Sequence, residues 1–427
     1  MVRQQQAGVA RRDLLKSSLA VAGAAAVAGA HRRAKADAGV LGANERIRLG
    51  VIGCGGLGLG HHIPTLMRMS KDPQFNIELA AVCDIYEPRK QRARELSGAE
   101  VFHDYRKLLD RKDIHGVVIV TPDHWHARMA IDAMEAGKDI HVEKPMTLYW
   151  EEAKKLYETA ERTRRVVQVG AEGTSLDVFW QANRAIREGK IGKVVWATGG
   201  VYRNVPEGDW NWPMDPDCSP KNLDWDAFLG PAPKRPFDPE RYFRYRKYWD
   251  YSGGPAHDLL AHVLSALQVS VGPEFPRRVS AAGGLYCHKD RETPDVFHMM
   301  VEYPSGYTAT LFCTQCTESG VETVIRGERG SISFPREGGR SPKAVRIDPE
   351  PAFHKDAAPV TIPGGPRMDH DANFIHCMRT REKTHCDALT GYKVMVALGL
   401  AVRSWREGRM FTFDPARQEI VAGLTGS

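Results

Sequence analysis

The sequence predicts an α/β protein with two domains behind an N-terminal export segment. Three observations predict this fold class: a glycine-rich turn directly after a β-branched apolar run, strands that alternate with helices up to about residue 170, and further strand-like segments beyond it. The chain has 427 residues, enough for two cores, because a single core rarely grows beyond about 250–300 residues. After Asp37, no apolar run is long enough to cross a membrane.

The first residues resemble a twin-arginine export signal. Arg11 and Arg12 precede an alanine-rich apolar run that ends near Ala30 in small residues typical of a cleavage site; the alternative is an ordinary surface helix. Residues 1–37 carry seven Lys or Arg and two Asp, so the net charge of +6 falls to about +1 in the rest of the chain, which gives no basis for a nucleic-acid surface. We expect a periplasmic protein that has no stable membrane anchor once residues 1–37 are removed.

A glycine-rich turn follows the first predicted strand. This strand is the segment "RIRLGVIG", and helical spacing begins within "GCGGLGLGHHIPTLMRM". Gly53, Gly55 and Gly58 make G-x-G-x-x-G between strand and helix, the pattern of a dinucleotide-binding βαβ unit. The first glycine permits the tight turn, the second lets the backbone approach a pyrophosphate, and the third allows the helix to pack closely on the strand. A pyrophosphate would then meet the free N–H groups at the helix N-terminus.

A second strand, "IELAAVCD", ends at Asp84, 26 residues after Gly58. A carboxylate here accepts hydrogen bonds from the adenosine ribose and repels a 2′-phosphate, so Asp84 favours NAD over NADP. Arg89 and Lys90 follow closely and leave NADP open; a plain turn role for Asp84 is the alternative. We therefore expect NAD or NADP, with NAD slightly preferred.

The next unit contains a predicted helix, the strand "GVVIV", a second helix and the strand "DIHVEKP". Strands and helices that alternate at this pitch indicate a parallel, doubly wound sheet, whose ligands collect at the carboxyl ends of the strands. The loop "TPDHWH" and the tripeptide Glu143-Lys144-Pro145 lie at such ends, so both should face the same crevice as the glycine turn. We place this dinucleotide-binding domain at residues 45–170.

The composition changes in the second half. Residues 202–251 hold 12 of the 36 aromatic residues, interleaved with Asp, Arg and Pro. Rings and hydrogen-bonding side chains together suit the C–H faces and hydroxyl edges of a sugar; the alternative is that the rings form the core of an irregular loop. After a Gly-Gly-Pro break, Asp258 and His262 lie four residues apart on one face of a helix. The remainder predicts successive strands and a late pair of helices.

The eight cysteines have no regular spacing. Cys313 and Cys316 form one C-x-x-C inside a strand-like segment without a second pair, so we expect no zinc site there. Buried or incidental thiols are the simplest interpretation, although an oxidising compartment would allow a bridge such as Cys377 to Cys386. Six histidines could suit zinc, but none stands in a recognised ligand spacing, and we assign no metal. These histidines are His61, His62, His124, His126, His257 and His262.

The order of the segments "GVIGCGGLG", "AAVCD", "VVIVTPDHWH", "AGKDIHVEKP" and "GGPAHDLLAHVLSAL" resembles the Gfo/Idh/MocA family of oxidoreductases. The resemblance covers nearly all of the chain after the signal. It implies an α/β fold with an N-terminal Rossmann dinucleotide-binding domain plus a C-terminal α/β domain at residues 171–415, whose late helices pack back on the first domain. It also implies a large open, mostly antiparallel sheet that carries the interface of a homodimer or homotetramer. The implied cofactor-binding residues are Gly53, Cys54, Gly55, Leu57, Gly58, Asp84, Thr121, Pro122, His126, Glu143 and Lys144.

The resemblance also implies a reaction, the oxidation of a sugar hydroxyl, with Lys144, Asp258 and His262 as the catalytic residues. His262 takes the hydroxyl proton as a hydride leaves the same carbon for the nicotinamide, a task that suits an imidazole because its ordinary pKa lies near neutrality. Lys144 binds the hydroxyl and stabilises alkoxide-like charge. Asp258 holds the charge balance or binds a neighbouring hydroxyl. His257 is a rival base that should point away from the face of His262.

An exported enzyme has to carry its cofactor with it, because the periplasm holds no comparable pool of free NAD(P). We therefore expect a tightly retained cofactor that is regenerated in each cycle, and a carbohydrate substrate. One alternative is an NAD-dependent glycoside hydrolase that works by transient oxidation and elimination. A second is a cofactor-bound binding protein without catalysis. Glu172 and Thr174 stand where relatives commonly carry Gln and Arg, which leaves the sugar and the hydroxyl undefined.

Overall fold

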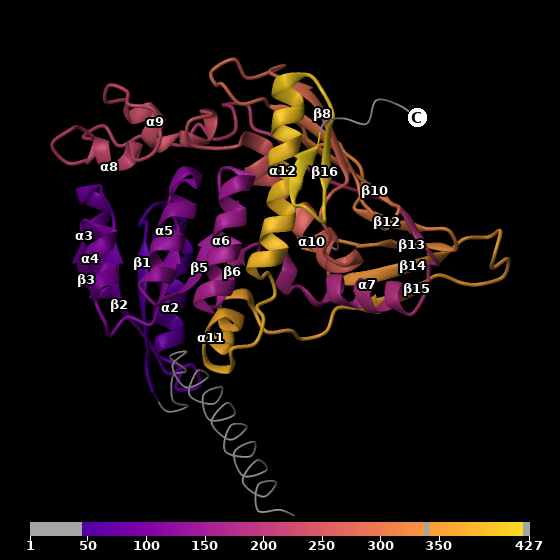
Figure 1. The fold of residues 1–427 in the computed structure, drawn as a ribbon, viewed down its shortest axis with the longest axis horizontal. Coiled ribbons are helices and arrows are strands. Elements are labelled where there is room, and N and C mark those ends of the chain that lie inside the picture. The colour runs from indigo at the N-terminus through magenta and orange to yellow at the C-terminus, as the bar shows by residue number, and fades with distance from the viewer. Residues whose placement is uncertain (1–44, 337–340, 422–427) are drawn as a thin grey trace, which may run out of the picture. The chain divides into compact units, whose positions relative to one another are not determined.

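The computed structural model describes residues 45–336 and 341–421. The expected export signal, residues 1–37, lies outside the described residues. The body of the fold begins at Arg46 and is built on two sheets (Figure 1). No helix among the described residues has the length and apolar character that a membrane span requires.

Six strands of the described chain form a parallel sheet in the order β3-β2-β1-β4-β5-β6. The central strands β1, β4 and β5 are buried along almost their whole length, which explains why their sequences are apolar without alternation. The predicted doubly wound sheet is therefore confirmed. The strands are β1 (Ile47–Ile52), β2 (Ile77–Cys83), β3 (Glu100–Phe102), β4 (Gly116–Ile119), β5 (Asp139–Glu143) and β6 (Val167–Gly170).

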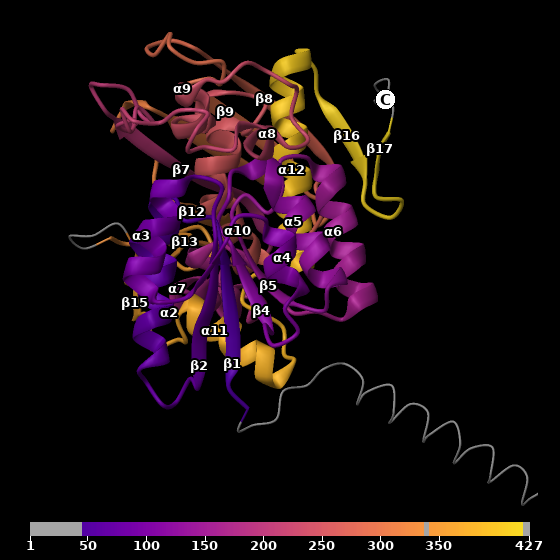
Figure 2. The same cartoon turned by 90° about the vertical axis from the view of Figure 1, so that its left-hand side faces the viewer.

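Helices connect these strands. The glycine turn leads into a short π-helix, η1, which continues directly as α2, so the predicted helix after the turn is present. In Figure 2, β1 and β2 run side by side with α2 and α3 next to them, and α2 and α3 both contact β2. The helices of this half are η1 (Gly58–His62), α2 (Ile63–Ser70), α3 (Glu87–Ser97), α4 (Tyr105–Asp110), α5 (Asp123–Glu135) and α6 (Trp150–Thr163).

The second sheet has eleven strands in the described residues, and β7 with β10 is its one parallel pair. The order is β15-β14-β13-β12-β7-β10-β9-β8-β16-β17, and β11 pairs with β7 off this path. The expected large, mostly antiparallel sheet is thus confirmed. Its strands are β7 (Val194–Asn204), β8 (Arg278–Gly284), β9 (Val296–Glu302), β10 (Thr308–Thr314), β11 (Cys316–Thr317), β12 (Val324–Gly327), β13 (Gly330–Ser333), β14 (Ala344–Pro349), β15 (Val360–Pro363), β16 (Phe411–Asp414) and β17 (Glu419–Val421).

One apolar core runs through both sheets and the helices between them. Helix α12 contacts α6 of the first half and β8 of the second. In addition, Trp150 of α6 packs edge-on against Phe413 of β16, with ring centroids 5.7 Å apart, so the two halves share buried surface. The helices of the second half are η2 (Glu172–Ser175), α7 (Asp177–Arg187), η4 (Ala256–Leu260), α10 (Ala261–Val271), α11 (His370–Thr380) and α12 (Ala388–Glu407).

Residues 206–251, which we call the cover, form a long irregular segment with three short helices. These are α8 (Trp225–Leu229), α9 (Pro239–Phe243) and η3 (Tyr245–Lys247). A separate apolar cluster joins the cover to Tyr86, just after β2. Its buried members from the cover are Leu223, Phe228, Leu229, Tyr242 and Tyr251.

Candidate functional site

A cavity of about 780 Å³ lies at the carboxyl ends of the parallel strands. Its floor includes Gly53 after β1, Asp84 after β2, Thr121 after β4 and Lys144 after β5. The cover and the helices η4 and α10 form the opposite wall. The glycine turn, the loop after β4 and the Glu-Lys-Pro tripeptide therefore face one cavity, and its volume lies in the range of cofactor sites.

The glycine turn forms a narrow part of this floor. Gly53 has φ +100°, and a Cβ atom there would lie 2.5 Å from the carbonyl oxygen of Val120, so no other residue fits without strain. A Cβ at Gly58 would overlap the carbonyl oxygen of Gly53. A Cβ at Gly55 or Gly56 would meet nothing closer than 3.5 Å, the distance to the Arg89 guanidinium from Gly55. The backbone at these last two positions is thus open to a ligand.

Asp84 holds the turn in place. Its Oδ2 accepts the backbone N–H of Cys54 at 2.7 Å, and its Oδ1 accepts that of Tyr86 at 2.8 Å. Asp84 lines the cavity while Cys54 lies buried behind the wall. The turn role that was an alternative for Asp84 is therefore real. It does not exclude the predicted ribose role, because each carboxylate oxygen keeps a free lone pair.

The residues expected to bind the cofactor fall into two groups. Cys54 and Gly58 lie outside the cavity wall: one donates its N–H to Asp84, and the other packs against Gly53. The rest line the cavity, and their open backbone and carboxylate fit a dinucleotide. The lining residues of this group are Gly53, Gly55, Leu57, Asp84, Thr121, Pro122, His126, Glu143 and Lys144.

His126 ties two loops of the floor together. Its Nδ1 lies 2.7 Å from the carbonyl oxygen of Pro145, and its Nε2 lies 2.7 Å from that of Thr121. The ring is buried at the wall of the cavity. His126 therefore positions the segments that carry Thr121 and Lys144.

Lys144 meets Asp258 across the cavity. The Lys144 Nζ donates to the Asp258 Oδ1 at 2.8 Å and to the Asp258 carbonyl oxygen at 2.9 Å. The same Oδ1 accepts the Arg246 Nε–H at 2.8 Å, and Oδ2 accepts the Trp210 indole N–H at 3.1 Å. Burial opposes the charge on Asp258, but the cations Arg246 and Lys144 outweigh it and hold the pKa of Asp258 well below its usual range. Asp258 is thus an anion shared by two cations.

His262 lines the same cavity as Lys144. Burial, helped by the positive charge of Lys144, lowers the pKa of His262 to about 4. The imidazole is therefore neutral at pH 7 and can accept a proton. The rival base His257 is buried outside the cavity wall, and neither of its ring nitrogens has a hydrogen-bond partner. Geometry favours His262.

Glu143 connects the cavity to a buried histidine network. Its Oε1 lies 2.9 Å from His62 Nε2, and its Oε2 accepts the backbone N–H of Lys144 at 3.1 Å. Burial lowers the pKa of His62, but Asp371 and Glu143 outweigh this and raise it to about 10. His61 lies 3.3 Å from Asp371. The network is a row of paired imidazoles and carboxylates behind the floor.

In three clusters of the described residues, side chains that could bind a metal ion come together. Within each cluster, the possible ligand atoms lie within 4.8 Å of one another. The first two belong to the histidine network, where the carboxylates already pair with imidazoles. The residues of the third cluster belong to the second half of the chain, after the parallel strands in the sequence. The clusters are His61, His62 and Asp371; His62, His141 and Glu143; and Cys287, Asp295 and Cys316.

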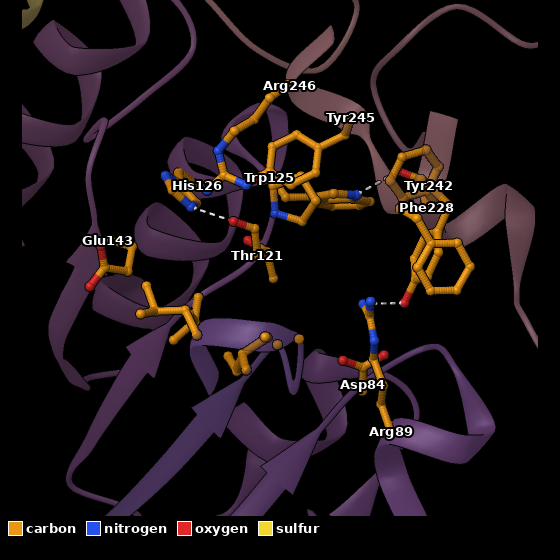
Figure 3. A pocket seen from close by; sticks show the side chains of 18 of the residues that line it. Asp84, Arg89, Thr121, Trp125, His126, Glu143, Phe228, Tyr242, Tyr245 and Arg246 are labelled. Atoms are coloured by element: carbon orange, nitrogen blue, oxygen red, sulfur yellow. Dashed lines mark hydrogen bonds between the residues drawn. The ribbon is translucent and has the colours of Figure 1, made fainter. Parts of the chain in front are cut away.

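The cover reaches the nucleotide end of the cavity. Arg89 points from the floor toward the cover (Figure 3) and donates to the Tyr242 hydroxyl at 2.7 Å, with its guanidinium 4.8 Å from the centre of that ring. His124 and Trp125 both bond the carbonyl oxygen of Phe228, at 2.7 and 2.9 Å. The aromatic segment was interpreted as a sugar surface, but this part of it packs on the dinucleotide-binding half.

Sequence reasoning missed the residues that hold Asp258. Trp210 and Arg246 belong to the cover and have no periodic spacing or motif. Their one sequence signal is membership of the segment in which rings and charged residues are mixed. Arg203 on β7 and Glu172 on η2 also line the cavity. Of these two, only Glu172 is named from the sequence, as a departure from the family pattern.

Two family models match the chain, and together they cover more than half of it. Residues 47–171 match the model described as "Oxidoreductase family, NAD-binding Rossmann fold". Residues 229–333 match the model "GFO/IDH/MocA C-terminal domain". The first match ends within the segment after β6, and the second spans the cover's last part and β8 to β13.

Curated relatives and solved structures agree with this. The chain is 36% identical over 173 residues to "Glycosyl hydrolase family 109 protein 1" of Shewanella sp. (strain ANA-3), which is 37% of this chain but only 36% of that relative's length. It is 26% identical over 325 residues to levoglucosan dehydrogenase of Pseudarthrobacter phenanthrenivorans, 68% of this chain and 74% of the relative. The WlbA dehydrogenase of Bordetella pertussis, solved with NADH and UDP-GlcNAcA, has a similar fold, with a TM-score of 0.65, 21% identity, and coverage of 87% of this chain and 98% of that one.

Proposed function

Because the chain belongs to the Gfo/Idh/MocA oxidoreductase family, with its NAD-binding Rossmann domain, we propose that it oxidises a hydroxyl of a sugar or sugar derivative. The observation that carries the proposal is that Lys144 and His262, from distant parts of the chain, line the cavity that begins at the glycine turn. A proton donor and a neutral base beside a dinucleotide site are what alcohol oxidation requires.

The chemistry divides among three side chains. The bound nicotinamide supplies the hydride acceptor. His262 accepts the hydroxyl proton, since burial keeps its imidazole neutral. Lys144 donates two of its three N–H groups to Asp258. The third N–H group can bind the reacting oxygen and stabilise negative charge on it. Asp258 positions Lys144 and balances its charge.

The cofactor stays bound between turnovers, with NAD preferred over NADP. Support comes from the cover, which lies over the dinucleotide side of the cavity and is held there by Arg89, His124 and Trp125. A cofactor kept in this way needs no free pool outside the cytoplasm. This agrees with export by the twin-arginine pathway to the periplasm, which the pair Arg11 and Arg12 suggests.

The second sheet provides the subunit interface of a homodimer or homotetramer. Its inner face is buried, as at Ala309 and Leu311. Its outer face carries Trp196 and Met300, which are 42% and 47% exposed and which such an interface would cover. Light scattering on a sizing column would measure the assembly, and a monomer at micromolar concentration would refute it.

A second candidate function is glycoside cleavage through transient oxidation and elimination. The relatives described as glycosyl hydrolase family 109 favour it, because the chain is 36% identical to one of them over 173 residues. The same Lys144 and His262 would serve, with the hydride returned to the sugar at the end of each cycle. The retained cofactor suits this chemistry as well.

One assay separates the two candidates. Purified protein, without added NAD, is incubated with nitrophenyl glycosides and, separately, with free aldoses and levoglucosan. Oxidation of a free sugar, with a rise in nicotinamide absorbance or a paired polyol product, supports the oxidoreductase. Release of nitrophenol without a net redox change supports the hydrolase. No reaction with any sugar, together with unchanged cofactor absorbance, would refute both and leave a binding protein.

A further inference from the structure

Two cysteines far apart in the sequence meet in the second half of the fold. Cys287 lies in the loop between β8 and β9, and Cys316 is in β11. Their sulfur atoms and a carboxylate oxygen of Asp295 all lie within 4.8 Å of one another. Cys287 is exposed and Cys316 is partly exposed, so both can be reached from solvent.

The backbone around the two thiols is already tied together. The ring Nε2 of His288 lies 3.2 Å from the carbonyl oxygen of Gln315, and the Gln315 N–H donates to the Asp295 carbonyl oxygen at 2.8 Å. Each contact joins a residue next to one cysteine with the opposite segment. A covalent link here therefore needs little rearrangement of the chain.

A metal ion fits this cluster poorly. The Asp295 carboxylate accepts three backbone N–H groups, from Tyr286 at 2.8 Å, Cys287 at 2.7 Å and His288 at 2.6 Å. These bonds leave its oxygens turned to the loop, and two thiols alone do not complete the four ligands of a structural zinc site. Two thiols without a metal are the reactants of a disulfide.

We propose that Cys287 and Cys316 form a reversible disulfide. Cys287, the exposed thiol, attacks the disulfide of a small or protein thiol oxidant and releases one reduced thiol. Cys316 then displaces the second half of the oxidant from Cys287. Overall, the two cysteine thiols lose two protons and two electrons, and the oxidant's disulfide takes them up and becomes two thiols.

The order of the two steps follows from the surroundings of Cys316. Burial, with Cys287 and the charge of Asp295 beside it, raises the pKa of the Cys316 thiol to about 12. A thiol is a poor nucleophile in its protonated form. Cys287 is therefore the thiol that reacts first, and Cys316 closes the link within the folded protein.

The link would fasten the loop that supports the cover. Asp290 in this loop pairs with the buried Lys247 at 2.8 Å, and Glu292 pairs with Arg241 at 2.9 Å. Lys247 and Arg241 both belong to the cover. The disulfide thus braces the base of the segment that closes the cavity, whatever reaction takes place inside.

The test uses the full purified chain, first reduced and then exposed to oxidised glutathione under native conditions. We expect the intact mass to fall by about 2 Da, the loss of two hydrogens, and a digest without reductant to contain one peptide pair joined through Cys287 and Cys316. Dithiothreitol should restore both thiols. The Cys287→Ser and Cys316→Ser variants should lose the linked pair.

Cys218→Ser is the matched control, because Cys218 is also partly exposed but belongs to the cover. This variant should keep the link in full. Both thiols still open to alkylation after oxidation, glutathione adducts in place of the internal link, or a link through another cysteine would each overturn the proposal. The test does not depend on any sugar or nucleotide, so its result is independent of the proposed function.

Discussion

The floor and the cover of the cavity are built by opposite means. The floor is a parallel sheet whose strands are buried and bonded to one another, and the glycine turn follows it directly. The cover has three short helices in residues 206–251 and is held by side-chain contacts, namely its apolar cluster and bonds such as that of Arg89 to Tyr242 at 2.7 Å. A regular sheet resists the loss of any one side chain, whereas a segment held by individual contacts does not. Substitutions should therefore separate cofactor binding, chemistry and cofactor retention.

The largest effect is expected on turnover, from substitution of Lys144 on the floor or of His262 on the opposite wall of the cavity. Lys144→Ala and His262→Ala should each lower turnover by about a thousandfold or more, because one removes the group that binds the reacting oxygen and the other removes the base. Both should keep their nucleotide, since the glycine turn and Asp84 are untouched. Turnover is measured with the responsive sugar, and bound nucleotide by mass spectrometry after denaturation.

Leu96→Ala provides a control for substitution outside the cavity, because Leu96 is 36% exposed on α3 and does not line the cavity. It should leave the chemical step nearly unchanged. Loss of nucleotide from the Lys144 or His262 variants would contradict the assigned roles.

A second effect should appear in the cover alone. Tyr242→Ala removes a buried ring and the partner of Arg89, so we expect the nucleotide to dissociate roughly tenfold to a hundredfold faster. Tyr242→Phe keeps the ring and loses only the hydroxyl, and its release should quicken by about fivefold or less. The rate is followed by stopped-flow cofactor fluorescence in the presence of excess competing nucleotide. Equal release from wild type and Tyr242→Ala would show that the cover does not retain the cofactor.

The floor could be predicted from the sequence because its strands and its glycine turn each require a characteristic local pattern of residues. Buried parallel strands require continuous apolar runs, and the steric needs of the turn admit only glycine at Gly53. These constraints act within a few residues of the chain, so they are visible in the sequence. The carboxyl-end rule then predicts from the sequence that Asp84, Thr121 and Lys144 face one cavity.

The partners of Asp258 could not be predicted in the same way. Trp210 and Arg246 reach it from an irregular segment, where neither spacing nor propensity relates a residue to its contacts. Likewise, Cys316 was paired in sequence with Cys313, which lies buried in β10, while its spatial neighbour is Cys287.

A smaller effect is expected at the junction of floor and nucleotide. Asp84→Asn replaces a carboxylate that accepts two backbone N–H groups with an amide that has a single acceptor oxygen. We expect NAD affinity to fall by about tenfold. Affinity for NADP should fall less or rise, because the charge that repels a 2′-phosphate is gone while Arg89 remains. Fluorescence titration of nucleotide-free protein measures both, and an unchanged ratio of the two affinities would exclude Asp84 from ribose selection.

The last effect concerns stability and pH, and it has opposite signs for a histidine at the contact between floor and cover and for one behind the floor. Burial lowers the pKa of His124, which bonds Phe228 of the cover, to about 4. Below pH 6.5, His124 is protonated in the unfolded chain but stays neutral in the folded protein. The free energy of unfolding therefore falls as the pH drops from 6.5 toward 4. His62 behind the floor has its pKa raised to about 10, so its contribution is complete below pH 6.5 and is lost as the pH rises toward 10.

Each effect should amount to about 1 to 3 kcal/mol in the free energy of unfolding. Denaturant titrations at pH 5, 7 and 9 would measure them. His124→Gln should flatten the acid side alone, and His62→Gln the alkaline side alone, because a glutamine amide can replace the imidazole Nε2 that bonds Phe228 or Glu143 and does not titrate. If either variant changed both sides equally, the two histidines would be coupled through the shared core, and the distinction between floor and cover would not extend to their stability.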